Sequence, residues 1–215
     1  MIEAVVFDLD GVLIDSEQVW DDVRRDYVIE AGGRWSDDAQ REMMGMSSVE
    51  WSRYVAEELG VARPPQRISE EIAAGVAAVY GRRLPLLPGA VEAVERLAAR
   101  WPLAIASSSN REVIDLVLDL AGFAGLFEAT VSSEEVGRGK PGPDVYLEAA
   151  RRLGVDPRRC AAIEDSHNGI AAADAAGMRV IAIPNRHYPP GDDYLARAAA
   201  VLDSLSELSP EIVEG

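Results

Sequence analysis

The chain has 215 residues, 48% of them hydrophobic, and its 37 acidic residues outnumber 21 Lys and Arg residues to give a net charge of −16. Nucleic acids and anionic membranes are bound through basic patches, so this charge argues against both as partners. No apolar run is long enough to span a membrane and no basic leader opens the sequence, so we expect a cytoplasmic protein, acting as a monomer. Cys160 is the single cysteine, which excludes an internal disulfide, and with His167 and His187 it does not complete a zinc site.

Two carboxylates follow the first apolar run, residues 4–7. Because side chains alternate along a strand, Asp8 and Asp10 leave its carboxyl end pointing the same way. Like charges repel there unless a cation or a shared proton separates them. This pattern indicates divalent metal and phosphate chemistry, in which one carboxylate attacks and the other handles protons. An Asp-rich turn is the alternative, since Asp and Gly are ordinary turn residues.

The next segment, from Ser16 to about Arg83, has a helical pattern throughout. Cap residues and closing glycines predict four helices, over 16–31, 36–44, 47–59 and 69–82. Ser47 and Glu50 make a capping box for the third of these helices. Its expected inward face consists of Val49, Tyr54, Val55 and Leu59. The sequence therefore predicts a four-helix insert.

The remainder of the chain alternates short strands with helices. Strands are expected at 103–107, 129–132, 160–164 and 179–183. Helices are expected near 89–100, 110–121, 142–153 and 167–176. This alternation predicts an α/β fold, a Rossmann-like parallel sheet covered on both faces. From about Asp203 we expect one short helix and a frayed tail.

Hydroxyl and amide groups follow the strand at 103–107, where Ser107, Ser108, Ser109 and Asn110 stand in a row. Such a cluster at a strand end can bind an anion. Ser109 with Glu112 fits a capping box, so the segment also opens a helix whose free N–H groups favour negative charge. A plain helix cap accounts for Ser109 but leaves Ser107 unexplained.

A lysine and two acids complete the set of candidate residues. Lys140 precedes a proline-initiated helix, from which it can reach a neighbouring site; the alternative is a solvated lysine. Glu164 and Asp165 end the strand at 160–164, and paired acids there suit an oxygen-seeking cation such as Mg²⁺. The alternative is that Asp165 or Ser166 only caps the following helix.

Taken in order, these segments resemble the four motifs of the haloacid dehalogenase superfamily of aspartate-nucleophile phosphotransferases, over nearly the whole chain. The motif residues are Asp8 with Asp10, Ser107, Lys140, and Glu164 with Asp165. Residues 8–17, Lys140-Pro141 and Glu164-Asp165-Ser166 are similar to the branch that contains β-phosphoglucomutase and small sugar-phosphate phosphatases. True dehalogenases lack the second aspartate of the first motif, so Asp10 argues against carbon–halogen chemistry.

The layout predicts a core of residues 1–14 and 86–215 with a helical cap, residues 15–85, of the type called C1. The motif segments all follow strands, so they lie in the crevice where open α/β sheets bind ligands, and the cap covers it. Asp15 with Ser16 and residues 83–88 are the two connections and the expected hinge. A cap of this kind can expel water and select the substrate.

The resemblance implies a mechanism in two steps. Asp8 attacks phosphorus to give an aspartyl-phosphate, while Asp10 first protonates the leaving oxygen and then activates water. Mg²⁺ is held by the Asp8 and Asp165 carboxylates and the backbone carbonyl of Asp10, with Glu164 as an additional or water-mediated ligand. The remaining phosphoryl oxygens are bound by two residues, Ser107 and Lys140.

The cap segment gives a weaker signal about the substrate. In the mutase branch a histidine in the first cap helix and an arginine after the Gly-x-Ser turn occupy the places of Trp20 and Ser48, and that arginine grips a second phosphate. Its absence favours a phosphatase acting on a small phosphorylated sugar or polyol. The alternatives are a mutase, with Arg24, Arg41 or Arg53 as the clamp, and a non-catalytic phosphometabolite-binding relative. The candidate substrate contacts are Trp20, Ser47, Ser48, Ser108 and Asn110.

Overall fold

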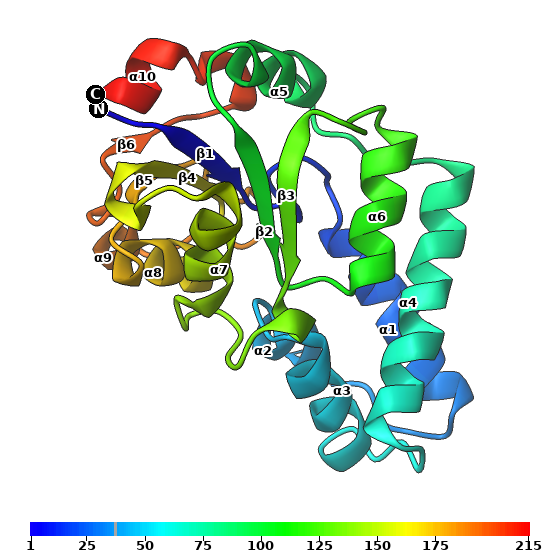
Figure 1. The fold of residues 1–215 in the computed structure, drawn as a ribbon. Coiled ribbons are helices and arrows are strands. Elements are labelled where there is room, and N and C mark those ends of the chain that lie inside the picture. Colours follow the sequence, from blue (N-terminus) through cyan, green and yellow to red (C-terminus); the bar gives the residue numbers. More distant parts are fainter. Residues whose placement is uncertain (37) are drawn as a thin grey trace.

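A parallel sheet forms the centre of the computed structural model, which describes residues 1–36 and 38–215 (Figure 1). Its strands are β1 (Ala4–Phe7), β2 (Leu103–Ser107), β3 (Phe127–Ser132), β4 (Cys160–Glu164), β5 (Arg179–Ala182) and β6 (Ala200–Val201). Their order across the sheet is β3-β2-β1-β4-β5-β6, and every neighbouring pair is parallel. The α/β fold class is confirmed, and β1, β2 and β4 lie side by side at the centre of the sheet.

Helices follow the strands and cover both faces of the sheet. They are α5 (Ala90–Ala98), α6 (Arg111–Leu120), α7 (Asp144–Leu153), α8 (His167–Ala175), α9 (Asp192–Leu195) and α10 (Pro210–Glu214). Alternate residues of β1 face opposite ways: Ala4 and Val6 share a buried cluster with α7 and α8, whereas Val5 and Phe7 share one with α5 and α6. This alternation is what a strand buried on both faces requires.

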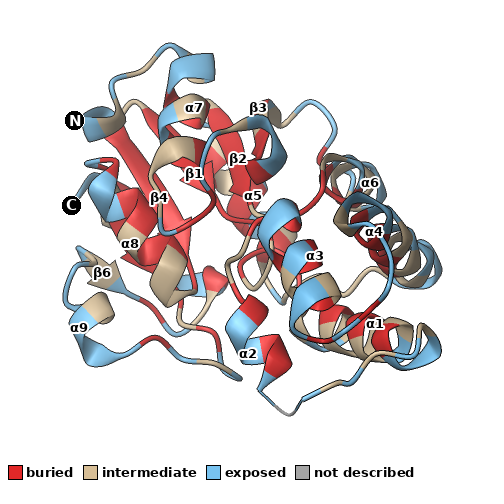
Figure 2. Ribbon diagram, turned by 90° about the horizontal axis from the view of Figure 1, so that it is seen from below, coloured by how far each residue is buried: buried red, intermediate tan, exposed pale blue. Residues whose placement is uncertain are grey.

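The predicted helical insert is present between β1 and β2 and lies together beside α6 (Figure 1). It consists of α1 (Glu17–Glu30), α2 (Ala39–Met43), α3 (Ser48–Glu57) and α4 (Pro65–Arg82). Within the described residues, no helix combines the length and apolar character needed to cross a bilayer. Seen from below, the strands are buried and the outer faces of these helices are exposed (Figure 2).

Two details of the insert differ from the sequence prediction. Helix α4 begins at Pro65, four residues before the expected start, because proline is well suited to the first helical turn, where its missing N–H is not needed. On α3 the buried residues are Ser48, Trp51, Ser52 and Val55, while Val49 is 55% exposed. The prediction for Val49 is wrong because the helix turns Trp51 inward. The capping box of Ser47 and Glu50 is confirmed.

The C-terminal segment is more ordered than expected. The sequence pattern missed β6 and α9, and the predicted frayed tail is wrong. Leu205, Leu208 and Val213 are buried in the core, and Arg96 of α5 donates hydrogen bonds to the backbone oxygens of Leu205 and Leu208. Burial of these apolar side chains holds the end of the chain against α5.

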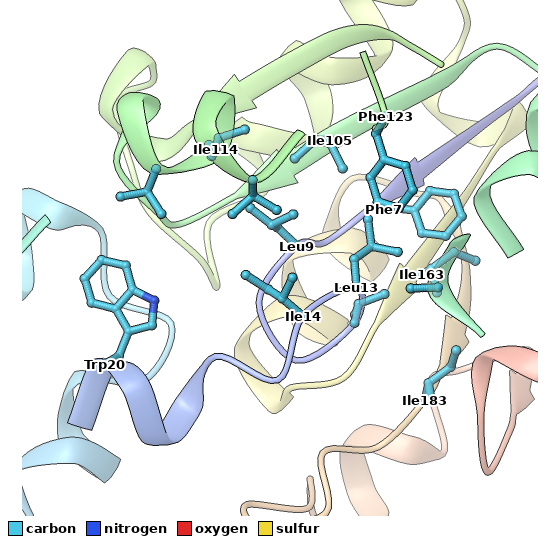
Figure 3. Packing of buried hydrophobic residues seen from close by; sticks show 14 of the residues in the cluster. Phe7, Leu9, Leu13, Ile14, Trp20, Ile105, Ile114, Phe123, Ile163 and Ile183 are labelled. Carbon is cyan, nitrogen blue, oxygen red and sulfur yellow. The ribbon is translucent and has the colours of Figure 1, made fainter. Parts of the chain in front are cut away.

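The turn after β1 is anchored by apolar side chains. Leu9, Leu13 and Ile14 are fully buried, and in Figure 3 they lie between Trp20 on one side and Phe7 with Ile163 on the other. The N–H groups of Leu13 and Ile14 both donate to the backbone oxygen of Leu9. With these residues packed into the core, the intervening polar residues are held at the edge of the sheet.

Candidate functional site

The ends of β1 and β4 and the segment before α7 place three charged side chains in contact. Lys140, which precedes α7, donates from Nζ to Asp8 Oδ1 at 2.7 Å and to Glu164 Oε1 at 2.6 Å. Its side chain is 3% exposed, so the solvated alternative for this lysine is wrong. Burial alone would lower the pKa of Lys140, but the carboxylates of Asp8 and Glu164 raise it above its ordinary value. The amine therefore stays protonated between the two acids.

Glu164 is saturated with hydrogen bonds. Besides Lys140, its Oε1 accepts from the hydroxyl of Tyr146 at 2.6 Å. Its Oε2 accepts from the backbone N–H groups of Asp165 and Ser166 and from the Ser166 hydroxyl, at 3.1 to 3.3 Å. Ser166, not Asp165, is the N-cap of α8. These contacts fix the carboxylate that holds Lys140 in place.

Asp165 points to the opposite side of the cluster. Its Oδ2 accepts from Asn185 Nδ2 at 2.9 Å, and the other end of the Asn185 amide accepts from the N–H groups of His187 and Tyr188. Gly11 lies so close that a Cβ atom there would stand 1.9 Å from Asp165 Oδ2, and its φ of +80° also favours glycine. The turn after β1 thus requires glycine for two reasons.

The three buried acids can share a cation. One oxygen of each of Asp8, Glu164 and Asp165 lies within 4.8 Å of the others. Burial and the neighbouring carboxylates raise the pKa of Asp8 to about 8, although Lys140 opposes this shift, and the same causes raise the pKa of Asp165. A bound cation would relieve this repulsion and keep both groups ionised.

Asp10 lies apart from this cluster and is surrounded by donors. Its Oδ1 accepts from the indole N–H of Trp20 at 3.2 Å. Its Oδ2 accepts from the hydroxyls of Ser107 at 3.3 Å and Ser109 at 2.7 Å. The predicted capping box of Ser109 with Glu112 is wrong: Asn110 is the N-cap of α6, which frees the Ser109 hydroxyl for Asp10.

Several expected substrate contacts instead join the helical insert to the sheet. Glu134, after β3, accepts at Oε1 from the Ser48 hydroxyl and the Asn110 side chain, both at 2.8 Å. Asn110 also donates to the hydroxyl of Ser69 on α4, at 2.9 Å. Ser48 and Asn110 therefore bridge the insert and the sheet around Glu134.

Ser47 and Ser108 are similarly engaged. The Ser47 hydroxyl oxygen accepts from the backbone N–H of Glu50, which makes Ser47 a helix cap, and the Ser47 backbone N–H donates to Glu50 Oε2 in return. The Ser108 hydroxyl donates to the backbone oxygen of Gly45 at 3.3 Å. Ser108 also lines both of the cavities between the insert and the strand ends, whereas Ser47 lines neither of these two cavities.

Two adjoining cavities separate the insert from the strand ends. The first encloses about 430 Å³ of empty space, partly open to solvent, beside Asp10. Its lining from the insert includes Glu17, Trp20, Arg24, Gln40 and Trp51. The second, of about 360 Å³, is lined by residues that include Asp8, Asp10, Lys140 and Asp165. Glu17 and Ser108 line both cavities, so the two lie next to each other.

Sequence reasoning missed several polar residues here. Tyr146 and Ser109 contact the acids directly, and Asn185 follows β5, where the same search of strand ends that located Glu164 could have found it. Gln40 carries no comparable signal, because only tertiary packing brings it to Arg24, which the sequence offered as a candidate clamp in the mutase alternative.

Comparisons with known proteins agree with this architecture. The family model for haloacid dehalogenase-like hydrolases matches residues 2–177. Hexitol phosphatase B of Escherichia coli (strain K12) is 35% identical over 221 residues, covering 100% of this chain and 97% of that protein. The crystal structure of CbbY from Rhodobacter sphaeroides in complex with phosphate has a TM-score of 0.88 and 27% identity, with 100% of both chains covered.

A further relative is longer than this chain. The bifunctional riboflavin kinase/FMN phosphatase of Arabidopsis thaliana is 34% identical over 209 residues, which span 96% of this chain and 54% of that protein. This chain therefore corresponds to about half of the Arabidopsis protein. The matched family model covers most of the chain and fits the sheet and the strand-end acids described above. The chain belongs to the haloacid dehalogenase-like hydrolases.

Proposed function

We propose that the chain is a magnesium-dependent phosphatase that hydrolyses a small phosphorylated sugar or polyol through an aspartyl-phosphate on Asp8. The observation that carries this proposal is the cavity wall on which Asp8, Asp10 and the buried Lys140 stand together. Relatives named hexitol phosphatase and phosphorylated carbohydrates phosphatase, the latter from Thermotoga maritima, support the substrate class.

Asp8 is the proposed nucleophile. One carboxylate oxygen forms a bond to phosphorus as the bond from phosphorus to the sugar oxygen breaks, and water then cleaves the acyl phosphate to release inorganic phosphate. Lys140 contacts Asp8 Oδ1, so it can direct the other oxygen toward phosphorus and bind a phosphoryl oxygen itself. The fully buried Ser107 contributes its hydroxyl to the same phosphoryl group.

Asp10 is the proposed acid and base. It gives a proton to the leaving sugar oxygen in the first half-reaction and takes one from water in the second. Trp20 donates to one of its oxygens and Ser109 to the other, so the carboxylate stays held in one orientation when Ser107 turns its hydroxyl to the phosphoryl group. A group that must act twice on the same reacting centre benefits from such fixed placement.

The donor set fits Mg²⁺, because it consists of carboxylate oxygens from two strand ends. We assign the ion to the carboxylates of Asp8 and Asp165 with the backbone oxygen of Asp10. When bound, it neutralises charge on these acids and on the phosphoryl group. Glu164 already accepts from Lys140, Tyr146 and the start of α8, so we assign it to hold Lys140; a direct metal contact from Glu164 stays a prediction.

The helical insert is the proposed cap, with boundaries at residues 15 and 85. The contacts of Ser48 and Asn110 with Glu134 hold it against the core, and α1 and α2 form the roof of the cavity. Closure of such a roof excludes water that would otherwise compete for the leaving-group proton and weaken the charge interactions. Opening at residues 83–88 and at Asp15 with Ser16 then admits substrate.

A screen of phosphate release over sugar and polyol phosphates, with and without Mg²⁺, tests the proposal. We expect Mg²⁺-dependent release from at least one hexose or hexitol phosphate, and loss of release after chelation. Release that survives exhaustive chelation would contradict the metal assignment. No release from any phosphate ester in the presence of Mg²⁺ would contradict the phosphatase itself.

The same substrates separate hydrolase from mutase. Ser48, at the place where a mutase carries arginine, donates to Glu134 and brings no positive charge to a second phosphate. Incubation with β-glucose 1-phosphate and a trace of glucose 1,6-bisphosphate should therefore yield inorganic phosphate. Phosphorus NMR measures the release of phosphate and the formation of glucose 6-phosphate in the same sample. Accumulation of glucose 6-phosphate without release of phosphate would reverse the assignment.

A further inference from the structure

One face of α1 lines the cavity beside Asp10. Glu17, Trp20 and Arg24 are spaced three and four residues apart, so they lie in a row along the helix, and all three line the cavity. Trp20 bonds to Asp10, and Arg24 lies about 6 Å further along the helix axis. This row therefore runs from the reacting centre toward the part of the cavity that a longer substrate would fill.

Arg24 is a buried cation that forms few hydrogen bonds. It is 7% exposed, and its guanidinium carbon lies 4.7 Å from the ring centre of Trp20 and 4.8 Å from that of Trp51. Among the residues that the structure describes, it forms no ion pair, and its buried Nε has no hydrogen-bond partner. The residue also lines the cavity, so its positive charge is available there to an acceptor that the cavity holds.

Gln40 of α2 fixes the position of this guanidinium. Its Oε1 accepts from Arg24 Nη1 at 3.2 Å, and its Nε2 donates to Glu17 Oε2 at 3.1 Å. The amide is thus oriented at both ends, and its side chain is buried. The cavity wall therefore presents an acceptor at Glu17 and a donor at Arg24, separated by Gln40.

The charges of this wall indicate which chemistry it accepts. Asp10 and Glu17 bring two acids to the cavity and Arg24 one cation, so a second phosphate would meet more repulsion than attraction. A hydroxyl group suits both ends of the row, since it donates to a carboxylate and accepts from a guanidinium. Trp20 and Trp51 add apolar lining to the same cavity.

We infer that Arg24, held by Gln40, is a specificity-determining residue that binds a hydroxyl oxygen at the end of the substrate remote from the phosphoryl group. It selects polyhydroxylated monophosphates over esters without hydroxyls, whereas the acids Asp10 and Glu17 disfavour a second phosphate. This inference rests on the proposed phosphatase activity and names the part of the substrate that the insert recognises. A site built to bond a hydroxyl discriminates strongly against a substrate that lacks it.

The test compares kcat/KM for sorbitol 6-phosphate, p-nitrophenyl phosphate and fructose 1,6-bisphosphate. In Arg24→Gln, we expect the ratio of sorbitol 6-phosphate to p-nitrophenyl phosphate to fall about tenfold to a hundredfold, mainly through KM, because one charged hydrogen bond is lost. Arg24→Lys should recover only part of this loss. Arg25→Gln, which removes a more exposed arginine of the same helix, should leave the ratio unchanged.

Three outcomes would overturn the inference. An equal loss on sorbitol 6-phosphate and p-nitrophenyl phosphate would make Arg24 structural, and a loss largest on fructose 1,6-bisphosphate would make it a phosphate clamp. If Arg24→Gln does not fold, Gln40→Ala is used in its place, and an unchanged ratio there counts against the inference. Failure of the unmodified protein to hydrolyse even p-nitrophenyl phosphate would instead remove the proposed function, and the two failures are therefore distinguishable.

Discussion

The two walls of the cavity differ in how completely their polar atoms are paired. On the wall made by strand ends, Lys140 bridges two acids at 2.6 and 2.7 Å, and Asp165 is bonded to Asn185. On the wall made by the insert, Arg24 retains a buried N–H without a partner among the described residues. The fixed Lys140 is preorganised for charge stabilisation on the first wall, whereas on the second wall the Arg24 guanidinium bonds only to a neutral amide within the described part of the chain and lines the cavity, so it is available to a ligand. The comparison assigns chemistry to the sheet and substrate choice to the helices.

Replacement of Asp8 by Asn tests the strand-end wall most severely. We expect turnover to fall by at least about 10⁴-fold, because the amide is a poor nucleophile. The fold should persist, because the Asn side chain is nearly isosteric with Asp. Phosphate release and circular dichroism measure the two quantities. Asp119→Asn, an exposed change on α6, is the matched control and should be active.

Loss of Lys140 should damage both stability and activity. In Lys140→Met the carboxylates of Asp8 and Glu164 stay buried without their cation, which costs about 3–5 kcal/mol of unfolding free energy in comparable buried pairs. Urea unfolding of the variant, of Glu164→Gln and of the double variant measures the coupling between the two residues. Fully additive losses would show that the bridge does not act as a unit.

Asn185 offers a gentler change on the same wall. Asn185→Ala removes the hydrogen bond that orients Asp165, so we expect the Mg²⁺ concentration for half-maximal activity to rise about 10- to 100-fold. Excess Mg²⁺ should restore the rate, whereas Asp165→Ala should remain severely impaired. An unchanged metal requirement would separate Asp165 from metal binding.

The smallest expected effect concerns the contact between insert and sheet. Glu134→Gln weakens the acceptor shared by Ser48 and Asn110, and we expect kcat and KM to change together by less than about tenfold. Glu128→Gln, an exposed change on β3, should have no effect. If Glu134→Gln leaves both constants untouched, this contact does not govern closure.

Sequence reasoning reached much of the strand-end wall because local rules determine it. Polar residues at the ends of buried strands converge at one edge of a parallel sheet, which predicts the positions of Asp8 and Glu164. Lys140 is predicted instead from its place before a proline-initiated helix. The strand and helix order followed from the same alternation of patterns. The predicted start of α4 differs from the observed start at Pro65 by a few residues, because a periodic apolar pattern does not show that a proline begins the helix.

The contacts made by the helices of the insert could not be predicted from the sequence, for a physical reason. Helix periodicity says which residues share a face, but not which faces of separate helices meet. The sequence does not predict that Ser48 bonds to Glu134, which lies 86 residues away in the chain. Arg24 and Gln40 are 16 residues apart and meet only because α1 packs beside α2. The sequence pattern predicts a helix cap at Ser109 because the bond of Ser109 to Asp10 joins the ends of two different strands, which a local pattern does not contain.

Trapping the phosphorylated enzyme tests the central claim most directly. Asp10→Asn should lose its acid and base and accumulate phosphate on Asp8 when incubated with Mg²⁺ and p-nitrophenyl phosphate, whose leaving group needs no proton. Peptide mass spectrometry should find one added phosphoryl group on the peptide that contains Asp8, and none in the Asp8→Asn, Asp10→Asn double variant. Phosphate attached to any other residue, or turnover by Asp8→Asn at the rate of the unmodified protein, would contradict the account.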